Sequence, residues 1–346
     1  MSPPPPNATL SPNIPLIPQR GWPMRDFAIT GIPTKDYYDF HGETESRIML
    51  GSTAIYASMA LAKQGADILF GGPISSELDK SLLRPLTDAG VKFALQELDG
   101  PPAWLRIVFG ENGRFTFFEM DMGVGTNFRA EQLTEDFWDA RICWLGTCPH
   151  PYKLAVAALG RAHGCEVGHS PQGEFGRDPA EFGPLIQNLT FVNTNTAELA
   201  ELGGRRLLHA IHLVREINPD LQILLTRGRH GAWFIRHNEI FSIPAIPQVE
   251  SEFLVGAGDT FAATFHYHRI QGQPIPVCLQ RATAAAVLKI RGFAYTTMGD
   301  LDEVLAKTDE IAPRLPVARA AWDSAEARRW IEQEEPDRTQ FGHRDD

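Results

Sequence analysis

Leu254-Val255-Gly256-Ala257-Gly258-Asp259-Thr260-Phe261 decides the fold of this chain, because it places two glycines and a carboxylate at the expected start of a helix over residues 258–270. Gly256 and Gly258 carry no Cβ, so an anion can approach the backbone N–H groups of the turn closely. These N–H groups have no partner within the helix, and the helix dipole favours negative charge there. The stretch predicts an anion site, with Asp259 either a base serving a bound hydroxyl or only a helix cap.

Apolar runs and helical segments alternate along most of the chain. A mostly parallel sheet with helices on both faces accounts for such alternation. The sequence therefore predicts an α/β fold with three layers, αβα. Expected strands cover residues 27–30, 67–70 (ended by Gly71-Gly72), 142–145, 191–193, 223–226 and 232–235, and further expected helices cover 54–64, 78–89, 152–163, 197–202, 206–217 and 277–290.

One segment departs from this alternation. Residues 104–109 and 114–118 are apolar and aromatic runs on either side of Glu111-Asn112-Gly113. Asn-Gly between two such runs is a strong hairpin signal. We expect a small β-lid, including about residues 100–120, over the carboxyl edge of the sheet, where α/β folds bind ligands. Because natural proteins tend to cover exposed strands, the lid is also a candidate surface for a homodimer.

Composition divides the chain into three parts. Residues 1–24 are proline-rich and predict a flexible, extended arm, with docking on the body as the alternative. Residues 25–312 form the expected main domain. Residues 313–346 form a charged C-terminal extension, in which Trp322 and Trp330 are candidate anchors for a helix.

Charge and cysteine content narrow the possible partners and compartment. The 346-residue chain has a net charge of −11 and no long basic run, which argues against a nucleic-acid partner. No apolar run approaches the roughly 20 residues of a membrane span, and the N-terminus has no apolar signal core. The four cysteines show no paired zinc-type spacing and fit buried thiols in a reducing compartment. We therefore expect a cytoplasmic protein.

Two further motifs precede the 254–261 stretch. Asn195-Thr196-Ala197-Glu198 and Thr226-Arg227-Gly228-Arg229-His230-Gly231 each follow an expected strand. With that stretch, they resemble in order the motifs of the ribokinase-like (PfkB) family of carbohydrate and nucleoside kinases, over about residues 26–312. The resemblance implies ATP and Mg²⁺ as cofactors. For catalysis, the resemblance implies that Asp259 is the base and that the amides of Gly256, Ala257 and Gly258 form the anion hole. It implies that Asn195 and Glu198 organise the phosphates and that Glu198 holds water-bound Mg²⁺. The nucleotide would then contact the turn formed by Thr226, Gly228 and Gly231, and Thr283 would lie on the helix flanking the adenine.

The side that would hold the acceptor departs from the family pattern. Asp36 matches an aspartate that grips acceptor hydroxyls, with Asp39 as a nearby competitor. Gly51-Ser52 stands for a Gly-Gly pair, and Tyr56 stands where the family has an asparagine that contacts the acceptor. Phe253 stands where many members carry an aspartate of a monovalent-cation loop, so the sequence leaves potassium activation undecided.

Two classes of function remain open. The first is an ATP-dependent kinase that phosphorylates a hydroxyl of a sugar, nucleoside or related small molecule. The second is a catalytically silent, nucleotide- or metabolite-binding relative with a regulatory role. The intact Asp259 favours the kinase, whereas Ser52 and Tyr56 keep the second class open. Within the first class, Tyr56 favours a nucleoside or modified sugar over a plain sugar.

Overall fold

The computed structural model describes residues 24–333, apart from 112–114, 172–178, 203–205 and 248–252. Its centre is a ten-stranded sheet in the order β14-β13-β12-β11-β10-β9-β8-β1-β4-β5. Pairing is parallel from β11 to β5 and antiparallel from β11 to β14. The strands are β1 (Arg25–Thr30), β4 (Ile68–Ser75), β5 (Lys92–Leu98), β8 (Ala140–Leu145), β9 (Glu166–His169), β10 (Phe191–Asn195), β11 (Gln222–Thr226), β12 (Ala232–Arg236), β13 (Glu239–Ile243) and β14 (Ala318–Ala321).

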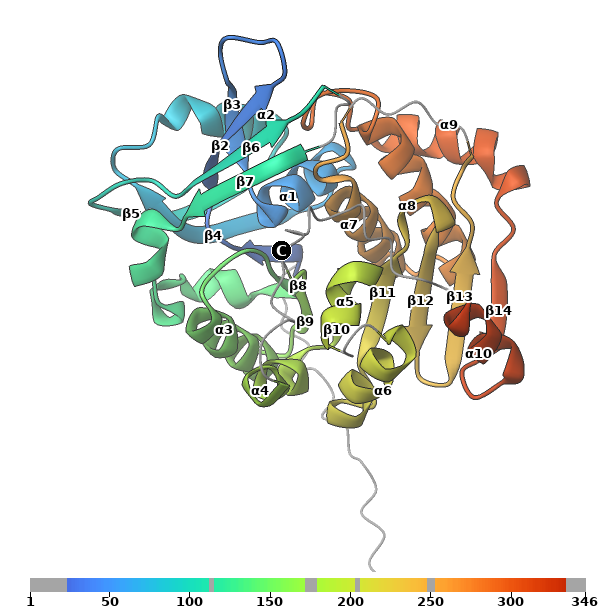
Figure 1. The fold of residues 1–346 in the computed structure, drawn as a ribbon. Helices are drawn as coiled ribbons and strands as arrows, with labels where there is room; N and C mark the ends of the chain where they lie inside the picture. The colour runs from blue at the N-terminus through green and yellow to red at the C-terminus, as the bar shows by residue number, and fades with distance from the viewer. Residues whose placement is uncertain (1–23, 112–114, 172–178, 203–205, 248–252, 334–346) are drawn as a thin grey trace, which may run out of the picture.

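Helices cover both faces of this sheet, which confirms the predicted three-layer αβα fold (Figure 1). One face packs under α1 (Thr53–Lys63), α2 (Arg84–Asp88), α7 (Ala257–Ile270), α8 (Ile275–Lys289) and α9 (Leu301–Ile311). The other packs under α3 (His150–Ala162), α4 (Pro179–Asn188), α5 (Thr196–Leu202), α6 (Leu207–Ile217) and α10 (Ala325–Glu332). Short 3₁₀ turns are η1 (Lys80–Leu83), η2 (Gly123–Asn127), η3 (Ala130–Gln132), η4 (Glu135–Trp138), η6 (Gly228–His230) and η7 (Ala312–Arg314).

A second, four-stranded sheet in the order β3-β2-β6-β7 stands beside the central sheet (Figure 1). It consists of β2 (Thr34–Phe40), β3 (Arg47–Gly51), β6 (Trp104–Phe109) and β7 (Phe115–Asp121). The antiparallel β6–β7 pair confirms the predicted hairpin, whose turn lies outside the described residues. β2 pairs in parallel with β6, so the sheet joins two segments far apart in sequence. Nothing in the sequence analysis pointed to β2 and β3.

Two of the predicted elements are wrong in detail. The strand expected to end at Gly71-Gly72 continues to Ser75, because the glycines let neighbours pack closely: a Cβ on Gly71 would lie 2.8 Å from the Phe137 ring. The helix expected over residues 78–89 is instead the 3₁₀ turn η1 followed by the five-residue α2. Pro85 lacks an N–H group, so it suits the first turn of a new helix, where it lies in α2, better than the middle of a longer one.

α1 and α7 are buried around most of their circumference and pack against each other beside the sheet. Small residues such as Ala57 and Ala263 permit this close packing. The contact brings the start of α1 next to the start of α7, so residues some 200 positions apart in the chain meet at one place.

Residues after 312 add to the central sheet. β14 pairs with β13, and α10 begins with Ser324, whose hydroxyl accepts from the Ala327 N–H group. The predicted helix is therefore present, with Trp322 and Trp330 packed against the adjoining core. The proline-rich residues 1–23 lie outside the described residues. All four cysteines are buried free thiols. In the described part of the chain, no helix has the length and apolar character needed to cross a bilayer.

Candidate active site

The first turn of α7 forms the centre of the candidate site. Gly256 caps the helix with φ 81° and ψ 2°, a left-handed conformation that glycine adopts without strain. A Cβ on Gly256 would also lie 2.0 Å from Cδ1 of Tyr56, so the tyrosine ring packs directly on this backbone. Both requirements explain why glycine occupies this position.

The backbone N–H groups of this turn differ in their bonding. The Ala257 N–H donates to the Leu254 carbonyl at 3.1 Å, so this amide already has a partner. Within the described residues, no acceptor is seen for the N–H groups of Gly256 and Gly258. These two amides are therefore the donors that the turn offers to an anion.

Asp259 lies one position further along this turn and is partly exposed. Burial raises the pKa of its carboxyl group to about 7, against the opposing effect of the positive charge on Lys289. A carboxyl group with a pKa near neutrality can accept a proton from a hydroxyl at neutral pH. Position and protonation therefore both suit a general base.

Asn195 and Glu198 lie where β10 ends and α5 begins. The Glu198 N–H donates to Oδ1 of Asn195 at 2.9 Å, and the Asn195 N–H donates to Oε2 of Glu198 at 3.1 Å. This reciprocal pair caps the helix. Burial raises the pKa of Glu198 to about 8, and the charge of Asp259 raises it further, so the two carboxylates are close enough to interact.

Thr226 ends β11 directly beside Asn195, with which it is paired in register, and its hydroxyl donates to the Thr194 carbonyl at 3.3 Å. The turn that follows needs its glycines: Gly228 has φ 52°, and a Cβ on Gly231 would lie 2.0 Å from the Ile243 carbonyl oxygen. The two predicted nucleotide motifs thus share the carboxyl edge of the sheet.

Thr283 is mostly buried on α8. Its hydroxyl donates to the Leu279 carbonyl within the helix at 2.9 Å. Because the hydroxyl is used within the helix, the part of this side chain left to contact a ligand is mainly its methyl group.

The donor set fits Mg²⁺ held together with phosphates. In the described residues, no three His, Cys, Asp or Glu side chains gather into a metal cage. Mg²⁺ commonly keeps several waters and binds one or two carboxylates plus substrate phosphates. Glu198 is a buried carboxylate whose pKa is raised by burial, and a divalent cation would stabilise its ionised form.

Asp36 lies on β2 and is buried. It accepts hydrogen bonds from the Thr34 hydroxyl at 2.6 Å and the Tyr38 hydroxyl at 2.8 Å, and burial still raises its pKa to about 7. A Cβ on Gly51 would lie 1.7 Å from Oδ2 of Asp36, so only glycine fits there. Asp39 lies on the opposite face of β2 and forms an ion pair with Arg106 at 2.6 Å.

Tyr56 connects the two halves of the site. Its ring packs on Gly256, and its hydroxyl lies 3.2 Å from the Tyr38 hydroxyl. Because Tyr38 donates its proton to Asp36, Tyr56 is the donor in this pair. The ring is almost completely buried, so it offers no open face for stacking in this conformation. Tyr56 thus fills space between the start of α7 and Asp36.

Ser52, at the start of α1, has φ 107° and ψ 158°. This region is essentially restricted to glycine. Its hydroxyl is buried and has no hydrogen-bond partner among the described residues. Ser52 therefore combines backbone strain with an unused polar group beside Gly51 and Asp36.

A groove of about 230 Å³ adjoins the Asp36 side of the site. Met49, which lies directly across from Asp36 in the β2–β3 pair, forms part of its wall. Tyr295 forms another part and contacts the Tyr56 ring edge-on, with 6.0 Å between ring centroids. The remaining lining residues are Ile48, Ser81, Leu82, Pro85, Phe293, Ala294 and Thr296.

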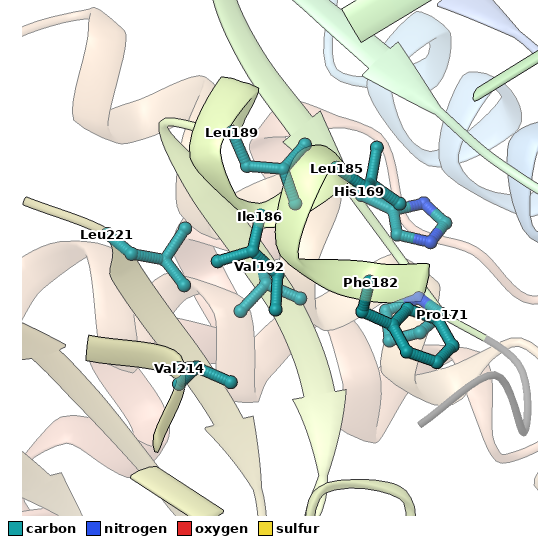
Figure 2. A pocket seen from close by; sticks show the side chains of 9 residues that line it. All are labelled: His169, Pro171, Phe182, Leu185, Ile186, Leu189, Val192, Val214 and Leu221. Carbon is teal, nitrogen blue, oxygen red and sulfur yellow. The ribbon is translucent and has the colours of Figure 1, made fainter. Parts of the chain in front are cut away.

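A second pocket lies away from this site, under α4 (Figure 2). Its one titratable lining residue, His169, is buried with a pKa held well below the usual range by burial. The other lining side chains are apolar, so the pocket is a packing feature of the core. They are Pro171, Phe182, Leu185, Ile186, Leu189, Val192, Val214 and Leu221.

The sequence analysis missed two residues near the site. Tyr38 supplies the hydrogen bond that connects Asp36 to Tyr56, and Lys289 is buried within electrostatic reach of Asp259. The alternation of Asp36 and Tyr38 on one strand face could have indicated the first. A lysine in an otherwise apolar helix end could have indicated the second.

Comparisons with known proteins identify the family and the fold of this chain. A family model for pfkB family carbohydrate kinases matches residues 53–298. The chain belongs to the pfkB family of carbohydrate kinases. Among solved structures, Arabidopsis thaliana ribokinase complexed with ribose and ATP matches with a TM-score of 0.72 and 20% identity, covering 82% of this chain and 99% of that one. Adenosine kinase from Sinorhizobium meliloti matches with a TM-score of 0.73 and 17% identity, covering 82% and 99%. These two likenesses show the fold.

Curated relatives match over shorter stretches. The ribokinase of Arabidopsis thaliana is 29% identical over 130 residues, which is 35% of this chain and 34% of that protein. The bifunctional protein HldE of Nitrobacter winogradskyi is 26% identical over 153 residues, or 42% and 31%. The chain thus spans about a third of the length of each of these relatives. Membership of the pfkB family and its fold are confirmed, whereas the acceptor is left open.

Proposed function

We propose that this pfkB family member is an ATP- and Mg²⁺-dependent phosphotransferase acting on an alcohol group of a sugar, a nucleoside or a related small molecule. The observation that carries the proposal is the first turn of α7, where Asp259 adjoins the open amides of Gly256 and Gly258. Glu198 lies within electrostatic reach of that carboxylate, at the edge that carries the predicted nucleotide turn. This arrangement suits phosphoryl transfer, which depends on positioning and charge stabilisation.

Each group then has a chemical role. Asp259 accepts the proton of the attacking hydroxyl, which its pKa of about 7 permits at neutral pH. The Gly256 and Gly258 amides donate to the phosphoryl oxygens as negative charge develops on them. Asp36, fixed by Thr34 and Tyr38, orients acceptor hydroxyls. Mg²⁺, held by the nucleotide phosphates and Glu198, supplies charge neutralisation when bound.

The test is the Asp259→Asn variant, with ATP turnover and ATP binding both measured. Asparagine keeps the shape of the side chain and cannot accept the proton, so turnover is expected to fall roughly 100-fold or more with ATP affinity nearly unchanged. Asp39→Asn, on the outer face of β2, is the matched control and should retain parent activity. Equal turnover in the Asp259→Asn variant and the parent rejects the assignment of the base.

We further propose a nucleoside or a modified sugar, rather than a plain sugar, as the acceptor. Tyr56 replaces a compact amide beside Asp36, which removes that amide's hydrogen bonds and reduces the room for a sugar ring. The groove walled by Met49 and Tyr295 starts next to Asp36 and suits an apolar or planar group. Kinetics with ribose, fructose and common nucleosides test this, and efficient turnover of ribose or fructose contradicts it.

The buried position of Tyr56 also supports the second class, a nucleotide-binding protein without turnover. In this conformation, its ring lies on Gly256 and fills part of the acceptor space. ATP binding without turnover of any acceptor in the panel would favour this regulatory alternative. Turnover of one acceptor that is abolished by Asp259→Asn would exclude it.

A further inference from the structure

Lys289 is a buried charged group to which the scheme above gives no role. It is the last residue of α8, and its side chain is 0% exposed. Its ammonium group donates to the Phe253 carbonyl at 2.8 Å and lies 4.6 Å from the Phe253 ring centroid and 5.8 Å from that of Tyr56. Carbonyl oxygens and aromatic faces both stabilise a cation, but burying a lysine remains costly. Such a group calls for a functional explanation.

The hydrogen bonds of Phe253 tie the active-site loop to the end of α8. The Phe253 N–H donates to the Ile290 carbonyl at 3.3 Å, while its carbonyl accepts from Lys289. Both backbone polar groups of Phe253 are thus held by two consecutive residues. Gly256 follows three positions later, so these two hydrogen bonds anchor the start of the short loop that leads to the open amides.

The charge of Lys289 also acts on the proposed base. Asp259 on α7 opposes the burial effect that lowers the pKa of Lys289 to about 7, and Lys289 opposes the burial effect that raises the pKa of Asp259. Tyr56 on α1 and Glu198 on α5 are the other titratable groups within reach of Asp259, and neither brings a positive charge. Among the described residues, Lys289 is therefore the positive group whose charge opposes the effect of burial on the pKa of this carboxylate.

We propose that Lys289 is a positioning residue of the phosphoryl-transfer site, a cation built into the chain that holds the loop from Phe253 to Gly256 and places a positive charge within electrostatic reach of Asp259. The inference rests on the proposed function for its kinetic consequence, but its geometry does not depend on the acceptor. Because the cation is covalently attached, turnover by the parent protein should not respond to added monovalent cations.

Lys289→Met tests the charge while keeping the length of the side chain, and Lys289→Gln keeps a donor for the Phe253 carbonyl without the charge. Lys63→Met is the matched control, because Lys63 also donates to a backbone carbonyl, that of Met298 at 2.7 Å. In both neutral Lys289 variants, kcat should fall about 10-fold or more, while the KM for the acceptor changes less than threefold. The acid limb of the kcat/KM profile should move to higher pH, and Lys63→Met should change neither quantity.

Titration of the ¹³C-labelled Asp259 carboxyl group gives a second readout that needs no turnover. Its pKa should rise by about one unit or more in Lys289→Gln and stay near the parent value in Lys289→Arg. If no acceptor is turned over, the proposed function fails while this titration still decides the role of Lys289. An unchanged Asp259 pKa in a folded neutral variant overturns the inference, as does a parent-like acid limb. Should Lys289→Met not fold, the Gln and Arg variants carry the comparison.

Adding ammonium chloride gives a further test. Lys289→Ala leaves a cavity beside the Phe253 carbonyl that a small cation can enter, so ammonium should restore part of its turnover. Tetramethylammonium chloride at equal ionic strength is too large and should not. Stimulation of the parent protein by ammonium to the same degree would contradict a built-in cation.

Discussion

Replacing Ser52 separates two costs that the structure places on one residue. At φ 107° and ψ 158°, its backbone lies in a region essentially restricted to glycine, and such strain costs on the order of 1–3 kcal/mol. The residue is only 9% exposed, and within the part of the chain that the structure describes its hydroxyl has no hydrogen-bond partner, a further cost of about 1–3 kcal/mol. A substitution that removes either cost should therefore raise the free energy of unfolding.

Two variants assign these costs. Ser52→Ala removes the hydroxyl and keeps the Cβ, so it should stabilise the protein by about 1 kcal/mol. Ser52→Gly also removes the backbone strain. The gain in stability is reduced by about 0.5–1 kcal/mol, because glycine has a greater chain entropy in the unfolded state. We therefore expect the free energy of unfolding of the Gly variant to exceed that of the Ala variant by about 1–2 kcal/mol.

Urea unfolding of the three proteins measures these differences. The midpoint should rise in the order parent, Ser52→Ala, Ser52→Gly, with the slope unchanged, because a changed slope would indicate an altered unfolded or native state. A Gly variant no more stable than the Ala variant would refute the strain argument. If the hydroxyl contacts the acceptor, both variants also raise the acceptor KM, a pattern that links the retained strain to function.

Three other outcomes follow from the site and the lid. Tyr56→Asn should improve kcat/KM for ribose or fructose about 10-fold or more over the parent, whereas unchanged preferences would mean that the ring does not restrict the acceptor. Burial raises the pKa of Asp36 to about 7, so its protonated form stabilises the folded protein; this contribution is complete below the unfolded pKa of 3.8 and is lost as pH rises through 7. The free energy of unfolding of the parent should therefore decline between pH 5 and pH 8, and Asp36→Asn should remove about 2 kcal/mol of that decline in urea titrations. Phe118 and Met120 lie on one face of β7 and are 53% and 40% exposed, so they could form the contact between two chains. In that case, changing both residues to serine should convert a dimer to a monomer in light scattering. Ile48→Ser, on the opposite face of the same sheet, should leave the dimer intact. A parent protein that is monomeric at every concentration would exclude this dimer.

Local signals in the sequence predicted most strands and helices of the central αβα layers. Apolar runs such as residues 142–145 and 223–226 became β8 and β11 because a strand buried on both faces needs little beyond apolar side chains. The Asn-Gly turn likewise predicted the β6–β7 pair. The strands β2 and β3 escaped prediction because polar and charged residues interrupt β2, and because both depend on pairing with distant or neighbouring strands: β2 pairs with β6, and β3 pairs with β2.

By itself, the sequence determined the αβα architecture, the resemblance to the pfkB family and the motif that carries Asp259, because all three depend on residue types at short spacings. Only the tertiary structure decided that Asp36 rather than Asp39 faces the candidate site, that Tyr56 lies on Gly256, and that the charge of buried Lys289 acts on Asp259. These contacts join α1, α7, α8 and the four-stranded sheet, which are distant in the chain. Their geometry arises from how helices and sheets pack, and no local pattern of residues encodes it.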